Sequence, residues 1–451
     1  MMKIDVFYKQ LEEKAFESGF ENIELFYQEG KEFNAKIFRE QLDNYQISEE
    51  SGVSIRGEYK GKMGYYYSEL IDESIIDEAL LAIISNSQLM DVDDEKIIGE
   101  ESIIDDSEDF DKSLIKSDYS MVIETMIENE KKLKGKDNLI SEVPYNMYVE
   151  IENYTVIRNS KGVQLSQKMN LFYYVLSALA KNDSKGKTAM KILADKNPEK
   201  FNADELIDNV YKESTGLLEA ESVPSGVYDV ILRKDVSAEF LNAFSGIFSA
   251  EMVDKGISVL KEKVNRRVGN DLLTIIDSPF EKSAYIHRKF DDEGMLTKEK
   301  NLIKSGVLKG YLHNSKTAKK MNSENTGNAI RSGVKSSLGI SHTNLFIKPS
   351  QGTLEEMIKE MGNGILIIEL QALHSGLNAI SGDFSLPAQG YLIESGEIVG
   401  TVDNITIAGN IMDVFNNVEK IGEDLEFYLP NNMGSVGSPS VMVKDIDITG
   451  K

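Results

Sequence analysis

Cysteine and tryptophan are both absent from this chain of 451 residues. Without cysteine the chain can form no disulfide, perform no thiolate catalysis and build no zinc site with a sulfur ligand. No run of about 18 apolar residues occurs, so no membrane-spanning helix is expected. The first twenty residues, MMKIDVFYKQLEEKAFESGF, also lack the uninterrupted apolar core of a signal peptide. These absences predict a cytoplasmic protein with no membrane partner.

Basic residues are fewer than acidic residues in this chain. The chain has 50 Lys and Arg against 75 Asp and Glu, which gives a net charge of −25. The first 221 residues hold 46 acids and 26 bases, whereas the remainder holds 29 acids and 24 bases. Such a surface repels phosphate backbones, and no basic stripe interleaved with aromatic residues is visible. We therefore expect no nucleic-acid partner.

Helical and strand-like patterns alternate along the chain. Apolar residues recur at helical spacing over 5–19, around 120–134 and over 202–218, and GVSIRGEYKGKMGYYYS predicts a β-hairpin that turns at its central Lys-Gly pair. A longer helix is expected over 238–261. Beyond it the sequence is rich in glycine and β-branched residues. The predicted fold class is α+β, with N-terminal α/β-type subdomains followed by a mostly antiparallel β C-terminal domain with few helices.

Two changes in composition divide the chain into domains. Residues 91–112 contain 11 acids in 22 positions, which predicts an exposed connection. Pro224 and Gly226, residue types that interrupt helices and strands, lie close to the point where the density of negative charge falls. The predicted domains are an N-terminal α+β domain (1–90), a central α+β domain (113–221) and a β-rich C-terminal domain (222–451).

Three blocks of the C-terminal half resemble the TldD/PmbA family, whose members were once labelled modulators of DNA gyrase. The blocks are FSGIFSAEMVDKGISVLKEKVNRRVGNDLLTIIDSP, FDDEGMLTKEKNLIKSGVLKGYLHNSKTAKKMNSENTGNA and LHSGLNAISGDFSLPAQGYLIESGEIVGTVDNITIAGNIMDVFNNVEKIGEDLEF. The resemblance is clear from about Ser222 to Gly450 and weaker over the N-terminal half. It implies membership of a cytoplasmic peptide-processing complex.

The family has a catalytic and a non-catalytic branch. The TldD-like branch carries His-Glu-x-x-x-His on the helix before the KGIS block, where two histidines hold zinc and the glutamate acts on a bound water. The corresponding positions here are Leu241, Asn242 and Gly246, and no histidine precedes His287. The cysteine that supplies a third ligand is also absent. The resemblance therefore implies the PmbA branch, also called TldE, with no catalytic residue, metal ligand or cofactor in this chain.

Partners are implied by the same resemblance. Members of this branch look like the non-catalytic half of a heterodimer with a TldD-like zinc peptidase, so zinc is expected in the partner subunit. A homodimer is the other expected assembly. The implied substrates are unfolded peptides, such as bacteriocin precursors or small labile proteins.

Two polar loops are candidates for contacts with such a peptide. In FDDEG, the predicted turn consists of Asp291, Asp292, Glu293 and Gly294, and Gly294 is expected to adopt positive φ. The resemblance implies that this loop lines a central groove. In LHSGLNAISGDFS, the candidates are His374, Ser375, Gly376, Gly382 and Asp383, in a flexible loop whose backbone could accept an extended peptide.

Three other functions compete with the binding subunit. A self-sufficient metallopeptidase could place a metal on His287, Asp291 and Glu293. A serine hydrolase could be built around Ser375 and His374, although no Gly-x-Ser-x-Gly elbow is present. A regulator of DNA gyrase would agree with the old family label, but the acidic charge disfavours contact with DNA.

Overall fold

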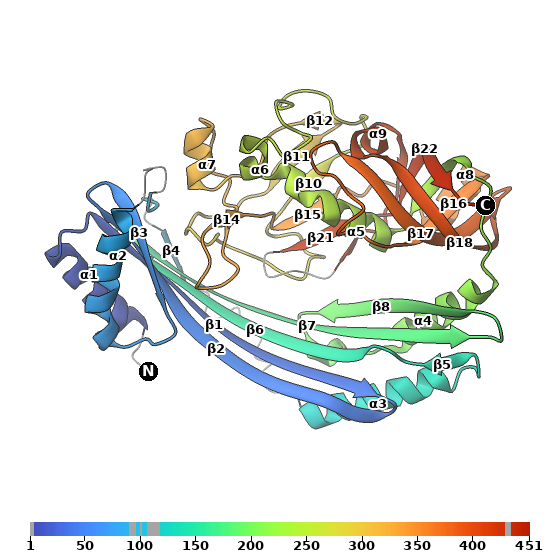
Figure 1. The fold of residues 1–451 in the computed structure, drawn as a ribbon, viewed down its shortest axis with the longest axis horizontal. Coiled ribbons are helices and arrows are strands. Elements are labelled where there is room, and N and C mark those ends of the chain that lie inside the picture. Colours follow the sequence, from blue (N-terminus) through green and yellow to red (C-terminus); the bar gives the residue numbers. More distant parts are fainter. Residues whose placement is uncertain (1–3, 90–95, 100–101, 106–117, 429–433) are drawn as a thin grey trace.

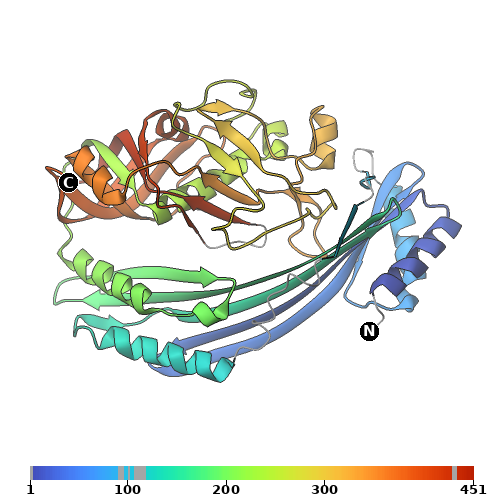
Figure 2. The same cartoon turned by 180° about the vertical axis from the view of Figure 1, so that it is seen from behind.

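The computed structural model describes residues 4–89, 96–99, 102–105, 118–428 and 434–451. Its architecture is α+β, as predicted: a long curved sheet from the N-terminal half cradles a β-rich C-terminal domain on its concave side (Figures 1 and 2). None of the helices in these ranges has the length and apolarity needed to cross a bilayer.

Among the described residues, the N-terminal sheet has eight strands in the order β3-β2-β1-β6-β7-β4, and β5 and β8 also pair with β7. Its strands are β1 (Asn22–Phe38), β2 (Gln41–Tyr59), β3 (Lys62–Ser68), β4 (Ser102–Asp105), β5 (Ile140–Glu142), β6 (Asn146–Asn159), β7 (Val163–Lys181) and β8 (Gly186–Asp195). The antiparallel pairing of β1 with β6 runs from Glu24 to Lys36 of β1. The segments 1–90 and 113–221 therefore contribute to one continuous sheet.

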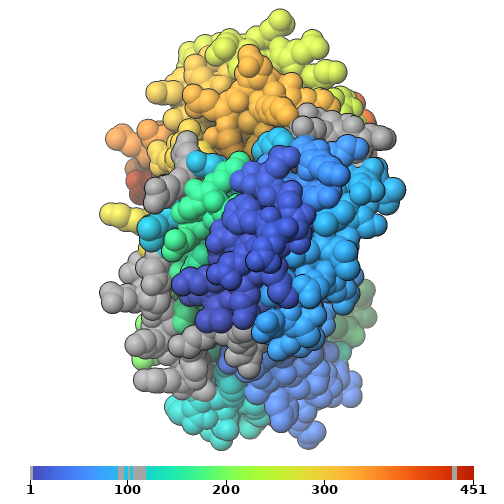
Figure 3. Space-filling view, turned by 90° about the vertical axis from the view of Figure 1, so that its left-hand side faces the viewer, coloured from blue at the N-terminus to red at the C-terminus, as the bar shows by residue number. Residues whose placement is uncertain are grey.

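Two pairs of helices cover the convex face of this sheet. They are α1 (Ile4–Glu17) with α2 (Ile76–Ser87), and α3 (Tyr119–Lys134) with α4 (Asp204–Gly216). Side chains alternate between faces along a strand, so Ile23 and Leu25 of β1 pack with α1 and α2, whereas Phe33 and Ala35 pack near α3 and α4. In Figure 3 the residues at the blue end of the colour scale, which include those of α1 and α2, form the surface at this end of the molecule, below the yellow and orange residues of the C-terminal domain.

Most of the predicted N-terminal elements are confirmed. Helices form close to the expected positions, and β2 and β3 form the predicted hairpin with Lys60 (φ 50°) and Gly61 (φ 77°) at its turn. Of the acidic segment 91–112, only 96–99 and 102–105 are described, and the latter form β4, which pairs in parallel with β7. The rest of that expected connection lies outside the described residues.

The described part of the C-terminal domain contains two six-stranded sheets and a short ribbon. One sheet has the order β18-β17-β16-β9-β22-β19 and the other the order β12-β11-β10-β15-β21-β20. The first comprises β9 (Gly226–Leu232), β16 (Gly364–Leu370), β17 (Asp383–Glu394), β18 (Glu397–Asn410), β19 (Val418–Ile421) and β22 (Val441–Thr449). The second comprises β10 (Ile275–Asp277), β11 (Lys300–Lys304), β12 (Val307–Leu308), β15 (Asn344–Ile347), β20 (Glu426–Phe427) and β21 (Ser435–Ser438), and the ribbon is β13 (Ala329–Ile330) with β14 (Gly339–Ile340). Most of these pairings are antiparallel, and β9–β16 and β15–β21 are parallel.

The single long helix expected over 238–261 is wrong. The chain instead forms α5 (Lys234–Phe244), a 3₁₀ turn (Ser245–Phe248) and α6 (Ala250–Asp254), and Ser249 between them is extended. Glycine lowers helix stability, and Gly246 and Gly256 lie where the helical path stops. The remaining described helices of this domain are α7 (Ser315–Lys320), α8 (Leu354–Met361) and α9 (Ile411–Asn416).

Candidate functional site

A cavity of about 880 Å³ lies between the concave face of the N-terminal sheet and loops of the C-terminal domain. Its floor comes from β1, β2, β6 and β7, and its roof comes from the loops 287–292 and 331–336. Its volume is within the range of cavities that bind small ligands. The strands come from both N-terminal segments, so the cavity requires all three parts of the chain.

The floor is polar because of the alternation of side chains in the sheet. Gln28 of β1 pairs with Gly52 of β2 and with Thr155 of β6, and Thr155 pairs with Gln167 of β7, so these four residues share one face. The same face of β1 continues to Phe26 and, further along, to Glu24, which C-terminal loops cover. One face of the sheet thus changes along its length from a covered, tightly packed region to an open polar one.

A glycine allows the roof to approach the floor. A Cβ atom at Gly52 would lie 2.9 Å from Cγ2 of Val334 and 3.0 Å from the carbonyl oxygen of Ser68. A larger residue at this position would therefore push the 331–336 loop away from the sheet.

The predicted FDDEG turn is confirmed. Gly294 has φ +85°, and its N–H donates to the carbonyl oxygen of Asp291 (3.0 Å). The three acidic residues of the turn are buried, at 1 to 4% exposure. Burial of three carboxylates requires hydrogen-bond or ionic partners for each of them.

The Asp291 carboxylate organises the backbone around the turn. Its Oδ1 accepts from the N–H groups of Glu293 (3.0 Å) and Met295 (2.9 Å), and its Oδ2 accepts from the N–H of Ala329 (2.9 Å). Burial, followed by the nearby Glu293 carboxylate, raises the pKa of Asp291, and the backbone donors oppose that shift. These contacts give Asp291 a structural role within the turn.

Glu293 joins the C-terminal domain to the N-terminal sheet. Its carboxylate accepts from the backbone N–H (2.9 Å) and the hydroxyl (2.5 Å) of Ser315, and lies 3.9 Å from Nη1 of Arg56. Arg56 in turn forms a two-pronged ion pair with Glu24, at 2.5 and 3.1 Å. Burial raises the pKa of Glu293, while the charge of Arg56 opposes that rise. This cluster fixes the position of the roof relative to the floor.

Asp292 is the member of the turn that lines the cavity. Its Oδ1 accepts from Nη2 of Arg288 (2.5 Å), and its Oδ2 accepts from the backbone N–H of Arg331 (2.7 Å). Asp292 therefore ties together the two loops that form the roof.

The second predicted loop does not belong to the lining of this cavity. His374 and Ser375 are exposed, and the Ser375 hydroxyl donates to the carbonyl oxygen of Ala372 (3.3 Å). Gly376 is half-buried, and Gly382 is buried with φ +86° just before β17. Asp383, the first residue of β17, accepts from the Asn410 side-chain amide (2.8 Å). The structure thus separates this loop from the FDDEG turn.

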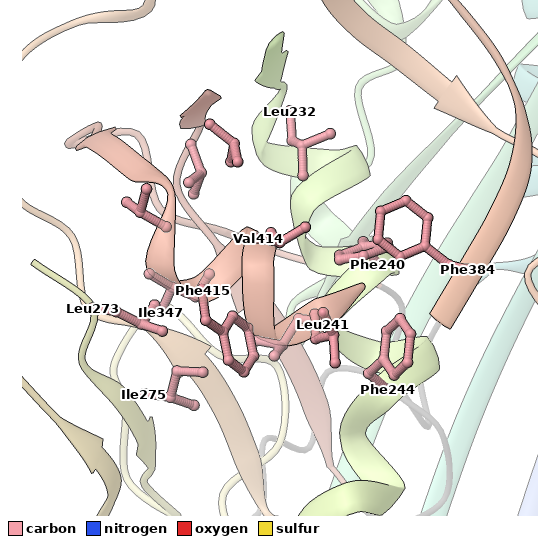
Figure 4. Packing of buried hydrophobic residues seen from close by; sticks show 14 of the residues in the cluster. Leu232, Phe240, Leu241, Phe244, Leu273, Ile275, Ile347, Phe384, Val414 and Phe415 are labelled. Carbon is pink, nitrogen blue, oxygen red and sulfur yellow. The ribbon is translucent and has the colours of Figure 1, made fainter. Parts of the chain in front are cut away.

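The positions that correspond to the zinc motif cannot hold a metal. Leu241 is 2% exposed and packs in the main core of the C-terminal domain (Figure 4). Asn242 is half-buried, and Gly246 is exposed and has no side chain. Zinc needs nitrogen, oxygen or sulfur donors converging on one point, and an aliphatic core residue and a glycine offer none. The residues present here therefore do not fit the zinc ion that the catalytic branch implies.

The alternative metal site around His287 is not assembled either. Its Nε2 lies 2.9 Å from the carbonyl oxygen of Glu281 and 3.3 Å from Nζ of Lys196, and burial lowers the pKa of His287. Within the described ranges no group of three or more His, Cys, Asp or Glu has an arrangement that could hold a metal ion. The set of His287, Asp291 and Glu293 is therefore not a site in this structure.

Sequence reasoning missed Glu24, Arg56 and Arg331. All three are charged and no more than 4% exposed. Glu24 and Arg56 lie within otherwise apolar stretches of β1 and β2, and a charged residue at such a position is a signal of a buried ionic partner. No comparable signal marks Arg331, which lies in a loop.

Comparisons with known proteins find matches to all three parts of the chain. Family models described as the PmbA/TldA metallopeptidase domain 1, central domain and C-terminal domain match residues 23–87, 112–215 and 225–450. A metalloprotease of Methanocaldococcus jannaschii is 27% identical over 398 residues, which cover 83% of this chain and 84% of that protein. The metalloprotease PmbA of Escherichia coli O157:H7 is 32% identical over 215 residues, covering 48% of this chain and 45% of that protein.

Solved structures extend the likeness over the whole fold. A crystal structure from Thermotoga maritima, whose name refers to modulation of a DNA gyrase, has a TM-score of 0.91 and 29% identity, covering 99% of this chain and 100% of that one. TldE from Thermococcus kodakarensis has a TM-score of 0.88 at 19% identity, covering 98% of this chain and 100% of that one, and so shares the fold. The matched domains account for most of the described residues, and the chain belongs to the TldD/PmbA metallopeptidase family.

Proposed function

We propose that this chain is the non-catalytic, peptide-holding subunit of a complex with a TldD-like zinc metallopeptidase. The observation that carries the proposal is the composition of the helix that bears the zinc motif in the catalytic branch. Leu241 is a core residue there and Gly246 has no side chain, so the motif positions supply neither the two histidine ligands nor the glutamate that acts as general base.

The cavity supports a role in holding peptide. Its floor presents polar side chains of a β-sheet, and its roof is fixed by the buried Glu24–Arg56–Glu293 cluster. A site whose walls are held in place before binding loses less entropy when a ligand enters. The name of the Thermococcus relative, TldE, agrees with assignment to the same branch.

The first test combines metal content with peptidase activity. The chain is purified alone without chelator, and its transition metals are measured by elemental mass spectrometry. We expect less than about a tenth of an equivalent of any metal, because a bound structural or catalytic ion requires deprotonated ligands that are missing. Hydrolysis of an unfolded peptide is then followed with the chain alone, with a family member carrying His-Glu-x-x-x-His, and with both together.

The expected result is activity that depends on the zinc-bearing member and increases when this chain is added. Close to one equivalent of zinc in the chain alone, or hydrolysis by the chain alone, would contradict the proposal. The same preparations are added to a DNA supercoiling reaction. An effect there without any effect on hydrolysis would favour the gyrase alternative.

A further inference from the structure

The N-terminal sheet has a free edge beside the cavity. β1 pairs with β2 from Gln41 to Glu58, whereas β3 pairs with β2 only from Val53 onward. β2 is thus the outermost strand of the sheet from Gln41 to Gly52 (Figure 1). Within the described residues, no backbone hydrogen bond joins this outer side of β2 to another segment. Because alternate residues of an antiparallel strand direct their N–H and C=O groups to opposite sides, a row of backbone donors and acceptors faces solvent here.

This edge lacks the features that commonly protect free edges from further pairing. Lysine, arginine and proline are absent from Gln41 to Gly52. The strand β8, on the other edge of the sheet, differs in this respect. Its Lys187 and Lys191 form ion pairs with carboxylates of the C-terminal domain. The outer side of β2 is therefore the edge that remains open to an additional strand.

Apolar side chains extend the convex face of the sheet up to this edge. Tyr45 and Ile47 of β2 pair with Ala35 and Phe33 of β1, which belong to the core beneath α3 and α4. Tyr119, at the start of α3, stacks on Phe33 with ring centres 3.8 Å apart. The cover ends there, because Tyr45 and Ile47 are each 58% exposed. A strand added beside β2 would remove apolar surface of both residues from water.

The charged side chains of the edge are all acidic. They are Asp43, Glu49 and Glu50. Asp43 and Glu49 form exposed ion pairs with lysines of β1, at 3.2 and 2.9 Å, whereas Glu50 has no ion pair with any residue in the described ranges. Glu50 shares the concave face of β2 with Gly52, and both line the cavity. A strand with basic side chains on its concave face is therefore complementary to this edge.

A second copy of the chain fits the edge less well. In an antiparallel pairing of two β2 strands about Gln46, Asp43 of each copy would oppose Glu49 of the other. Like charges directly opposite one another destabilise a strand pair. Each copy also carries a net charge of −25. The charge of the edge therefore favours a basic peptide over self-association.

We propose that the outer edge of β2, from Gln41 to Ser51, binds an extended peptide of alternating apolar and basic residues by strand addition. The apolar side chains of the peptide pack beside Tyr45 and Ile47 on the convex face, and its basic side chains lie near Glu50 at the rim of the cavity. The added strand lies beside β2, in line with β3, and ends before Gly52. This inference rests on the proposed peptide-holding function and names the class of peptide that is held.

The test measures binding of fluorescein-labelled octapeptides to the full chain by fluorescence anisotropy. The probe alternates valine with lysine. One control peptide has the same residues in blocks of two, so that neither face is apolar, and another replaces each lysine with glutamate. We expect each control to bind at least about tenfold more weakly, because it loses either the cross-strand apolar contacts or the complementarity with Glu50.

Methylation of the peptide backbone separates strand addition from non-specific adhesion. Methyl groups are placed on the amide nitrogens of either the odd-numbered or the even-numbered residues of the probe. An added strand directs only one of these two sets toward β2, so one methylated probe should lose binding and the other should retain most of it. Equal effects of the two methylations would contradict strand addition.

Ile47→Lys locates the binding site on the protein. It places a cation on the edge, so the lysine-bearing probe should bind at least about tenfold more weakly. Leu81→Lys is the matched control, because Leu81 is an apolar residue of α2 that is 68% exposed, and its replacement should leave the affinity unchanged. Thermal unfolding followed by circular dichroism verifies that both variants are folded.

The outcomes distinguish this inference from the function on which it rests. Unchanged binding of the probe by folded Ile47→Lys would overturn the edge site while peptide holding stands. Failure of all probes to bind would overturn the edge site, and would overturn peptide holding as well if the chain also had no effect on hydrolysis by the zinc-bearing member. Sedimentation velocity without peptide tests the other occupant. A dimer that Ile47→Lys dissociates would assign the edge to a second copy and overturn the peptide as its occupant.

Discussion

The Glu24–Arg56 ion pair offers a sharp test of how roof and floor are held together. The two side chains are 0 and 1% exposed, and both prongs of the contact lie within the sheet. Glu24→Gln keeps the size of the side chain but removes its charge. Arg56 then has the Glu293 carboxylate, 3.9 Å from its Nη1, as an acidic neighbour.

The expected cost follows from the burial of both charges. Removing one partner of a buried pair leaves the other charge without compensation, which costs about 3–5 kcal/mol. Arg331 also lies nearby and adds to the positive potential, as its lowered pKa shows. By contrast, the exposed pair Lys14–Asp77 should contribute less than about 1 kcal/mol.

Urea unfolding measures the difference. Far-UV circular dichroism and tyrosine fluorescence report the transition, since the chain has no tryptophan. We expect Glu24→Gln to lower the free energy of unfolding by about 3–5 kcal/mol and Asp77→Asn to leave it within about 1 kcal/mol. The double variant Glu24→Leu with Arg56→Met should recover part of the loss, because an apolar pair needs no desolvation of charge. A loss below about 1 kcal/mol for Glu24→Gln would refute the view that this pair holds the site together.

Three further predictions concern the FDDEG turn, the Arg233–Asp235 ion pair and the position of the lost zinc motif. Gly294→Ala should lower stability by about 1–2 kcal/mol, because φ +85° is strained for alanine, whereas Gly246→Ala, whose Cβ would meet nothing within 4 Å, should not; urea unfolding of both variants distinguishes them. Burial raises the pKa of Asp235, but the Arg233 guanidinium lowers it by more, so the net pKa lies below its ordinary value. This ion pair therefore stabilises the fold above about pH 4, and its contribution to stability is lost as the pH falls. The stability difference between Asp235→Asn and the parent should shrink as urea unfolding is repeated from about pH 5 downward, and a constant difference would contradict the assignment. Leu241→Ala should cost about 2–5 kcal/mol in the same assay as a cavity in the core, and a loss below about 1 kcal/mol would show that this position is not packed as described.

Local sequence patterns were sufficient to predict many of the helices, strands and turns. The hairpin at Lys60 and Gly61 and the FDDEG turn form as expected, because glycine at positive φ is a requirement of the backbone within a few residues. The expected helix over 238–261 failed because apolar spacing continues past Gly246, while the helical path stops there and Ser249 is extended. Periodicity cannot distinguish one long helix from two short ones that share a core.

The candidate site, too, could be predicted from the sequence only in part. The sequence placed Asp292 near a groove and showed that Leu241 and Gly246 cannot hold zinc, since the identity of a side chain fixes its donor atoms. It gave no sign that Asp291 and Glu293 would be buried or that His374 to Asp383 would lie apart from the cavity. Those properties depend on which segments meet, and contacts between distant segments leave no local pattern.

The sequence by itself determined the family resemblance, the α+β class, the main turns and the loss of the metal ligands, because each depends only on residue types and on their spacing over short distances along the chain. Only the tertiary structure decided that two N-terminal segments share one sheet, through the pairing of β1 with β6, and that its polar face meets the 287–292 and 331–336 loops around a cavity. Strand pairing and domain packing are settled by the burial of whole faces at once, and Arg56 and Arg331 each contact a residue more than two hundred positions away along the chain, Glu293 and Ser54.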